Sequence, residues 1–140
     1  MSYWLLKTEP GDFSYDDLEK DGKTIWDGVT NNWALKNMKD VCNGDQVFIY
    51  HTGKEKCIAG IGMVTSDPYA DPKATDSKYI VFDVTPKQKL SRKVTLQMLK
   101  EDKFFSDFML VKFTRLSVMP VEEKIWSRII QLDTQLSQSG

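Results

Sequence analysis

Strand-like and helical segments follow one another along this chain in an irregular order, and that order limits the folds it can adopt. Runs rich in β-branched and aromatic residues predict strands at residues 3–7, 46–52, 57–65, 78–85 and 116–121. Helical patterns separate some of these runs but not others. Because a doubly wound parallel sheet requires regular alternation of strands and helices, the order favours an α+β fold. We expect five or six strands in a curved or closed sheet, with four helices.

The first helix has the clearest start signal. Ser14 is a capping residue, Asp17 stands at the third helical position, and Phe13 and Leu18 have the spacing of a hydrophobic staple. Gly22 can adopt the left-handed conformation that ends a helix.

Three further helices are predicted. One follows Asn31 or Asn32 and runs to about Asp40, one follows Thr95, and the last begins near Glu122. The stretch 104–113 has no clear pattern.

Two glycines in the run CIAGIGMV constrain the sheet more closely. Gly60 and Gly62 are two residues apart, so they lie on the same face of the predicted strand. Glycine inside a strand indicates a close approach by a neighbouring group or a bend in the sheet.

Composition bounds the class of protein. The 140 residues are enough for one domain, expected at 1–133, with a flexible tail at 134–140. Cys42 and Cys57 are too few for a disulfide framework or, alone, for a zinc site. No run is long enough to span a membrane, and no leader is evident. We therefore expect a monomer in the cytoplasm, or in the nucleus of a eukaryotic cell.

Charge is unevenly spread along a chain whose net charge is −1. Residues 1–34 are acidic and residues 86–116 are basic, which allows a local basic face to exist on a protein that is neutral on average. A solvated surface with scattered charges is the alternative. The side chains expected to contact a nucleic-acid backbone are Lys36, Lys39, Arg92, Lys93 and Arg115.

No standard catalytic pattern is present. The chain lacks a phosphate-binding glycine loop and a nucleophile elbow, and its single histidine excludes any site that needs two imidazoles. An enzyme would have to pair His51 with Glu9 or Asp27 as acid and base, and we keep a hydrolase or small-molecule-binding protein of this kind as the alternative. A structural role for His51, hydrogen-bonded at the end of a strand, is the simpler interpretation.

Polar residues follow predicted strand ends at three separate places, in the segments 7–10, 26–31 and 50–52. If these turns converge, they enclose an aromatic-walled cavity with a few hydrogen-bonding groups. Such a cavity suits a flat heterocycle, because indole and phenol rings stack on its faces while Thr and Asn contact its edge. Trp26 would then be a wall of the cavity. The alternative is an interaction module whose cavity is filled by its own side chains.

The motifs YWLLKTEP, WDGV, GDQVFIYHT, PYADP and RLSVMPV, taken in order, resemble the EVE domain family over nearly the whole chain. The resemblance implies a PUA-like twisted β-barrel with surrounding helices, related to YTH domains. It also implies a non-enzymatic reader of modified nucleobases in DNA or RNA that uses no cofactor or metal. The matched ligand-binding positions are Lys7, Thr8, Glu9, Pro10, Trp26, Asp27, Val29, Asn31, Tyr50, His51 and Thr52.

Two positions depart from the family pattern. Thr30 and Leu35 stand where the family often has arginines, so two planar, permanently charged groups suited to phosphate are missing. Lys36 and Lys39 supply charge nearby, but only as point charges. Asn31 serves either as a helix cap or as a reader of the base edge.

Overall fold

The computed structural model describes residues 1–139, except for the side chains of Arg92 and of residues 135–139. The strands are β1 (Tyr3–Thr8), β2 (Thr24–Trp26), β3 (Gln46–His51), β4 (Cys57–Val64), β5 (Tyr69–Ala70), β6 (Ile80–Thr95) and β7 (Val118–Val121). The helices are α1 (Tyr15–Asp21), α2 (Asn32–Lys39), α3 (Leu96–Lys100), α4 (Met109–Lys112) and α5 (Glu123–Ser139), with a short 3-10 turn η1 (Lys103–Phe105). None of the described helices has the length and apolar character needed to cross a membrane.

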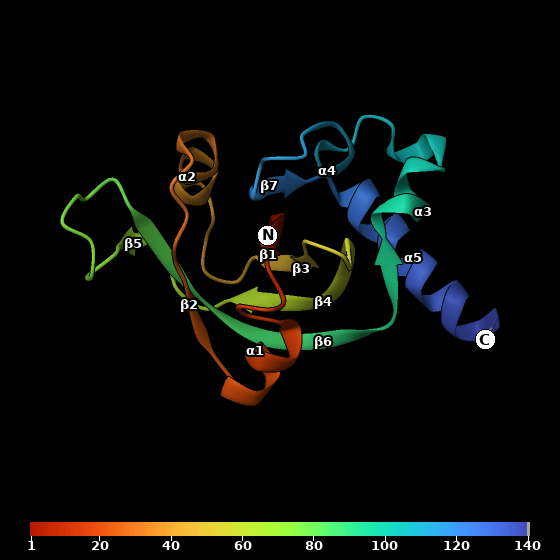
Figure 1. The fold of residues 1–140 in the computed structure, drawn as a ribbon, viewed down its shortest axis with the longest axis horizontal. Coiled ribbons are helices and arrows are strands. Elements are labelled where there is room, and N and C mark those ends of the chain that lie inside the picture. Colours follow the sequence, from red (N-terminus) through yellow and green to blue (C-terminus); the bar gives the residue numbers. More distant parts are fainter. Residues whose placement is uncertain (140) are drawn as a thin grey trace.

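Six strands form one curled, mixed sheet in the order β2-β6-β4-β3-β1-β7, and β5 pairs separately with β6 (Figure 1). Only the β1–β3 pair is parallel, while the other pairs are antiparallel. The curled sheet with its surrounding helices confirms the predicted α+β class and the strand number. In Figure 1, α2, α4 and α3 lie on the same side of the sheet, opposite α1.

The helix boundaries follow the expected capping residues. The Ser14 hydroxyl accepts a hydrogen bond from the Asp17 N–H, and the Asp17 carboxylate accepts one from the Ser14 N–H in return. Gly22 ends α1 in the left-handed conformation, with φ of 77°. Asn31 caps α2 by accepting from the Ala34 N–H at 3.0 Å, so the cap role of Asn31 is confirmed.

Other elements differ from the sequence-based expectation. The unclear stretch 104–113 contains α4, a fifth helix that the sequence did not predict. β6 continues to Thr95, ten residues beyond the predicted end at residue 85, because the basic residues that follow are held in the sheet by pairing with β4. The backbone is helical through Ser139, where we expected a tail from residue 134, and Gly140 lies outside the described residues. The flexibility of this tail stays a prediction.

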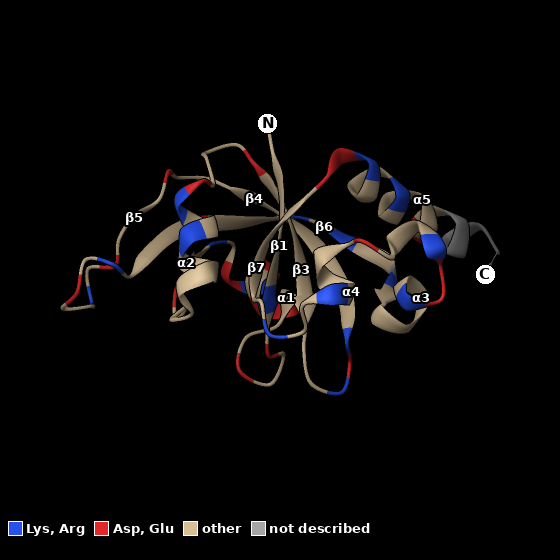
Figure 2. Ribbon diagram, turned by 90° about the horizontal axis from the view of Figure 1, so that it is seen from above, with Lys and Arg blue, Asp and Glu red and all other residues tan. Residues whose placement is uncertain are grey.

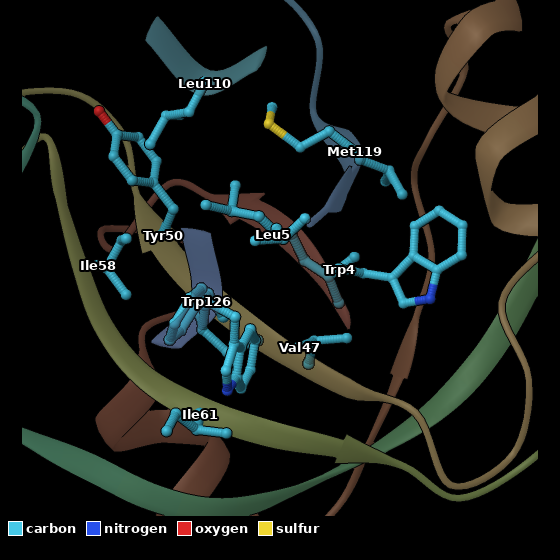
Figure 3. Packing of buried hydrophobic residues seen from close by; sticks show 14 of the residues in the cluster. Trp4, Leu5, Val47, Tyr50, Ile58, Ile61, Leu110, Met119 and Trp126 are labelled. Carbon is cyan, nitrogen blue, oxygen red and sulfur yellow. The ribbon is translucent and has the colours of Figure 1, made fainter. Parts of the chain in front are cut away.

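The core lies between the curled sheet and α5. One tryptophan of α5 makes the main aromatic contact with the sheet. Trp126 stacks on Phe48 with ring centroids 3.8 Å apart and on Tyr3 at 4.5 Å. Figure 3 shows Trp126 among buried side chains of the sheet, near Ile61 and Val47. Trp126 and Phe48 are both buried, so this stack removes a large apolar area from water and fixes α5 against β1 and β3.

The two glycines of β4 have different neighbours. A Cβ atom on Gly60 would lie 2.5 Å from the buried ring of Tyr15, and one on Gly62 would lie 2.9 Å from Val84. The pairing of β4 also shifts register beside both glycines. The predicted close approach is therefore present, and at Gly60 the approaching group is a side chain.

Candidate functional site

A cavity of about 380 Å³ opens beside Trp26. Its size falls within the range of small-molecule and cofactor pockets. It is lined by Lys7 and Thr8 from the end of β1, by Phe13, by residues 24–31 and by Ser117. The end of β1 and the segment that includes β2 and the turn after it are far apart in the sheet order, and they line the same cavity. The predicted cavity joined three turns, and whether this one binds a base stays a prediction.

The third predicted turn, at residues 50–52, lies beside the turn after β1, but its residues line a different cavity. Parallel pairing aligns Lys7 with Tyr50 and Thr8 with His51, so the ends of β1 and β3 are at the same level. Tyr50 and Thr52, however, line a separate cavity of about 260 Å³, which Lys7 also lines. The side chain of Lys7 thus stands between the two cavities.

Two rings line the cavity beside Trp26. Trp26 is 6% exposed, and Phe13 packs with its ring at 80° to the indole and 6.3 Å away between centroids. The pair therefore forms a corner rather than two parallel walls. Phe13 was missed as a lining residue because its spacing to Leu18 already accounted for it as a staple.

Lys7 and Asp27 are the charged residues among those that line this cavity. Lys7 Nζ donates a hydrogen bond to the carbonyl oxygen of Thr114 at 3.0 Å and lies 5.7 Å from the centre of the Tyr50 ring. Burial lowers the pKa of Lys7, because desolvation disfavours the charged amine. Asp27 is exposed. Among the described lining residues, Lys7 is thus the one charged donor and Asp27 the one charged acceptor.

The rest of the predicted set is divided between turns. Val29 and Asn31 line the cavity beside Trp26. The turn at residues 28–30 also lines a neighbouring hollow, together with Asp71, Tyr79 and the first two residues of β6. Pro10 lies in the turn after β1, and the Glu9 carboxylate accepts a hydrogen bond from the Thr52 hydroxyl at 3.2 Å.

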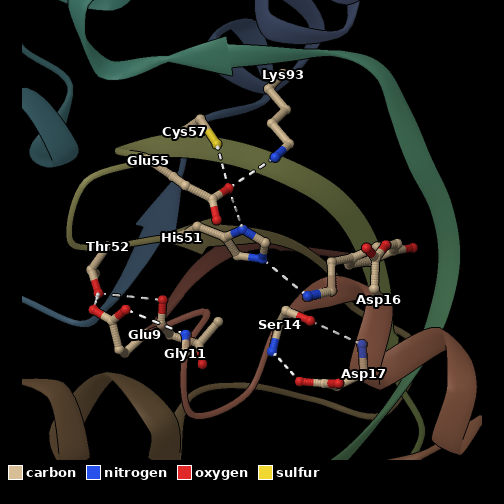
Figure 4. A network of polar contacts seen from close by, with 12 residues as sticks. Glu9, Gly11, Ser14, Asp16, Asp17, His51, Thr52, Glu55, Cys57 and Lys93 are labelled. Carbon is tan, nitrogen blue, oxygen red and sulfur yellow. Dashed lines mark hydrogen bonds and ion pairs between the residues drawn. The ribbon is translucent and has the colours of Figure 1, made fainter.

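His51 is buried in a polar network behind this site (Figure 4). Its Nε2 accepts a hydrogen bond from the backbone N–H of Tyr15, and its Nδ1 lies 3.0 Å from the carboxylate of Glu55. Since the amide can only donate, Nε2 carries no proton and Nδ1 is the protonated nitrogen. His51 thus has Glu55 as its carboxylate partner, not Glu9 or Asp27 as the acid–base alternative required.

The same network contains three potential metal ligands, from His51, Glu55 and Cys57, whose atoms lie within 4.8 Å of one another. The protonated Nδ1 has no lone pair to offer a metal in this arrangement. Burial also raises the pKa of the Cys57 thiol to about 11. In this arrangement the three groups are joined to one another, because His51 Nδ1 and Cys57 Sγ both contact the Glu55 carboxylate.

The basic segment 86–116 is partly neutralised by its neighbours. Lys89 pairs with Asp16 at 2.6 Å, and Lys93 pairs with Glu55 at 2.9 Å in the network around His51. Figure 2 shows basic positions on α2, α3 and α4, and acidic ones interspersed among them. The positive charge expected on this segment is therefore reduced at Lys89 and Lys93, and a basic face stays a prediction.

The residues predicted to contact a nucleic-acid backbone lie in several different parts of the fold. Lys36 and Lys39 are exposed on α2, and Arg115 lines a hollow beside Asn31. The side chain of Arg92 lies outside the described residues. Leu35 is buried in the core, so this position offers no contact to phosphate in this chain.

Comparison with known proteins decides the family. The profile of the EVE domain family matches residues 2–132. The chain belongs to the EVE domain family. A curated EVE relative, thymocyte nuclear protein 1 of Danio rerio, is 27% identical over an alignment that covers 96% of this chain and 73% of that protein. The human thymocyte nuclear protein 1 alignment is 31% identical, but covers 62% of this chain and 44% of that protein.

Solved structures place the fold. A hypothetical protein from Leishmania major has a TM-score of 0.91 and 34% identity, with 98% of this chain and 97% of that chain covered. Human THYN1 protein in complex with 5-methylcytosine containing DNA has a TM-score of 0.87 and 25% identity, with 95% and 98% covered. A YTH domain from Zygosaccharomyces rouxii has a TM-score of 0.58 at 15% identity, covering 94% and 86%, which shows a shared fold only. The predicted PUA-like architecture of the EVE domain is confirmed.

Proposed function

We propose that this EVE domain binds nucleic acid that carries a modified base, and holds that base in the cavity beside Trp26. Two separated turns line this cavity together with a tryptophan, and that convergence is the observation that carries the proposal. The complex of human THYN1 with DNA containing 5-methylcytosine supports the same class of ligand. DNA containing 5-methylcytosine is therefore the first ligand to test, with RNA as the second.

The lining residues suit the edge of a cytosine. Cytosine presents its N4 amino group as a donor, and aspartate is a side chain that accepts from it, which gives Asp27 a role. Lys7 is a donor for the acceptor atoms on the same edge. The ring of the base packs in the corner formed by Trp26 and Phe13, where stacking on an aromatic side chain contributes about 1–3 kcal/mol.

The base must leave its stack to enter the cavity. Extrusion from a duplex costs a few kcal/mol, and it costs least where the base is mismatched or already single-stranded. We therefore expect single-stranded or mismatched methylated DNA to bind more tightly than a matched methylated duplex.

In this proposal the protein acts by binding rather than by catalysis, because the buried imidazole of His51 is held by a backbone amide and Glu55. The name of the relatives, thymocyte nuclear protein, supports a nuclear location if the host cell is eukaryotic.

The test measures the affinity of the protein for three single-stranded oligonucleotides that differ at one central base, which is 5-methylcytosine, cytosine or thymine. The expected order has 5-methylcytosine first. Thymine also carries a 5-methyl group but presents O4 as an acceptor in place of the N4 donor, so it isolates the role of Asp27. We expect Asp27→Ala to reduce the preference for 5-methylcytosine over thymine by about tenfold.

A matched control is Asp107→Ala. Asp107 is an exposed aspartate that lines a different cavity, beside Phe108 and Pro120, and its removal changes the net charge by the same amount. The control should strengthen the binding of all three oligonucleotides equally. Equal affinities of the wild type for methylated and unmethylated cytosine, in DNA and in RNA, would rule the proposal out.

A further inference from the structure

A second hollow, of about 290 Å³, lies beside the first between the start of α2 and the segment after α4. Its lining includes two exposed aromatic residues, Trp33 and Phe113, which are 42% and 38% exposed. Large rings at this exposure leave apolar surface in water, and such surface, rimmed by polar residues, is typical of an interaction site.

The two rings hold each other in place. Their centroids lie 5.0 Å apart at an angle of 75°, which is an edge-to-face contact. In such a contact the edge of one ring covers the face of the other, and the outer faces stay available. A planar group therefore has a rigid apolar surface on which to stack.

The charged residues around Trp33 and Phe113 indicate which kind of planar ligand this surface binds. Lys112 and Arg115 line the hollow, and Lys112 Nζ lies 5.9 Å from the centre of the Phe113 ring. Among the described residues that line the hollow, none is acidic. An aromatic surface beside cationic side chains is the combination that binds single-stranded nucleic acid, in which bases stack and phosphates are neutralised.

The second hollow is continuous with the site already described. Asn31 lines both the cavity beside Trp26 and the second hollow. Thr114 lines the second hollow and also the cavity beside Tyr50 and Thr52. Its carbonyl oxygen accepts a hydrogen bond from Lys7, which lines the cavity beside Trp26. A strand that leaves the first cavity on the side of Asn31 would therefore meet the second hollow.

We propose that Trp33 and Phe113 form a second nucleobase site, which stacks the base next to the inserted one in the same strand, with Arg115 and Lys112 at its phosphate. This inference rests on the proposed function, and it gives the domain a binding footprint longer than one nucleotide. Arg115 then supplies a guanidinium group at a position different from the two arginines that Thr30 and Leu35 replace.

The test compares two single-stranded DNA probes that both contain one central 5-methylcytosine. In the first the flanking nucleotides are intact, and in the second both flanks are abasic. We expect the wild type to bind the intact probe about 5- to 150-fold more tightly, the range that base–aromatic stacking spans. Trp33→Ala should remove most of this difference and leave the affinity for the abasic-flanked probe unchanged, while Trp33→Tyr should retain most of it.

A matched control is Phe104→Ala. Phe104 is 43% exposed and lies 5.3 Å from the guanidinium of Arg128, so it has the same exposure and a neighbouring cation but does not line the hollow. This variant should bind both probes as the wild type does.

The two proposals fail in different ways. If Trp33→Ala weakens both probes equally, or weakens neither, the second base site is refuted while methyl preference remains intact. If the wild type binds methylated and unmethylated probes equally, yet still requires intact flanks and Trp33, the modified-base proposal is refuted and the stacking surface stands.

Discussion

Lys7 donates a hydrogen bond from its ammonium group to the main-chain oxygen of Thr114, 107 positions later in the sequence. This contact joins the end of β1 to the segment after α4, and it places the amine where two cavities meet. Burial lowers the pKa of the amine, so Lys7 loses its proton at a lower pH than an exposed lysine does.

Binding should therefore depend on pH through Lys7. As the pH rises toward the lowered pKa of Lys7, the charged donor is lost and the affinity for an oligonucleotide should fall, before the exposed lysines titrate. Lys7→Arg should show little of this fall, because arginine stays protonated throughout. Oligonucleotide titrations from about pH 7 to about pH 9.5 measure the effect, and parallel curves for the two proteins would contradict it.

Gly60 should tolerate no larger residue. In Gly60→Ala the added methyl group meets the Tyr15 ring at 2.5 Å, and the ring is held by a 2.7 Å hydrogen bond from its hydroxyl to the Ile61 carbonyl. We expect a loss of about 2–3 kcal/mol in the free energy of unfolding, measured by denaturant titration. Gly11→Ala is the control, because its nearest neighbour lies 3.7 Å away on an exposed side chain. A loss as large at Gly11 would show that strain against Tyr15 is not the cause.

Local signals in the sequence were sufficient for most of the fold. Capping residues such as Ser14 and Asn31 act within one turn of helix, so their effect is readable from spacing alone. β2 was not among the predicted strand runs, although a strand end was expected near Trp26, and the reason lies in its pairing. β2 has three residues and exists through its pairing with β6, which is a tertiary interaction that no local pattern encodes.

The site was predictable only in part, for the same reason. The turn at residues 26–31 contains an unusual cluster of Trp, Asp and Asn, and this local signal drew attention to a segment that lines the cavity. That Tyr50 faces a different cavity from Trp26 depends on strand pairing, because β3 lies beside β1 whereas β2 pairs with β6 at the edge of the sheet. The exposed ring of Trp33 gave no signal, since the helix pattern does not distinguish an exposed aromatic from a buried one.

Asp45 should be important for stability rather than for binding. Its buried carboxylate accepts hydrogen bonds from the backbone amides of Ser2 and Cys42 and from the indole N–H of Trp4 at 2.9 Å. Asp45→Ala leaves these donors without an acceptor and should lower the free energy of unfolding by about 2–4 kcal/mol. The nearby Asp67→Ala, which removes one exposed hydrogen bond to Asn43, should cost less than about 1 kcal/mol. Similar losses in denaturant titrations of the two variants would argue against this explanation.

Stability should fall in acid partly through Glu55. Hydrogen bonds from Lys93 and His51 lower the pKa of this carboxyl to about 2 from an ordinary value of 4.5. A lowered pKa stabilises the fold above the ordinary value, and that stabilisation is lost as the pH falls from about 4.5 to about 2. Because Glu55 is partly exposed, solvent screens the effect. Thermal unfolding of Glu55→Gln should show a shallower decline over this interval than the wild type, and identical slopes would contradict the assignment.

The order of strands in the sheet has a consequence for the size of ligand that the cavity beside Trp26 can bind. β2 and β1, which both supply lining residues, are separated by β6, β4 and β3. In a flat sheet four strand spacings would hold them about 19 Å apart, too far to enclose one planar ring. The width of the cavity beside Trp26 thus depends on the curvature of the sheet across the three intervening strands. A substitution that changed their curvature, for example at the register shifts next to Gly60 and Gly62, would widen or narrow the slot without altering any residue in its walls.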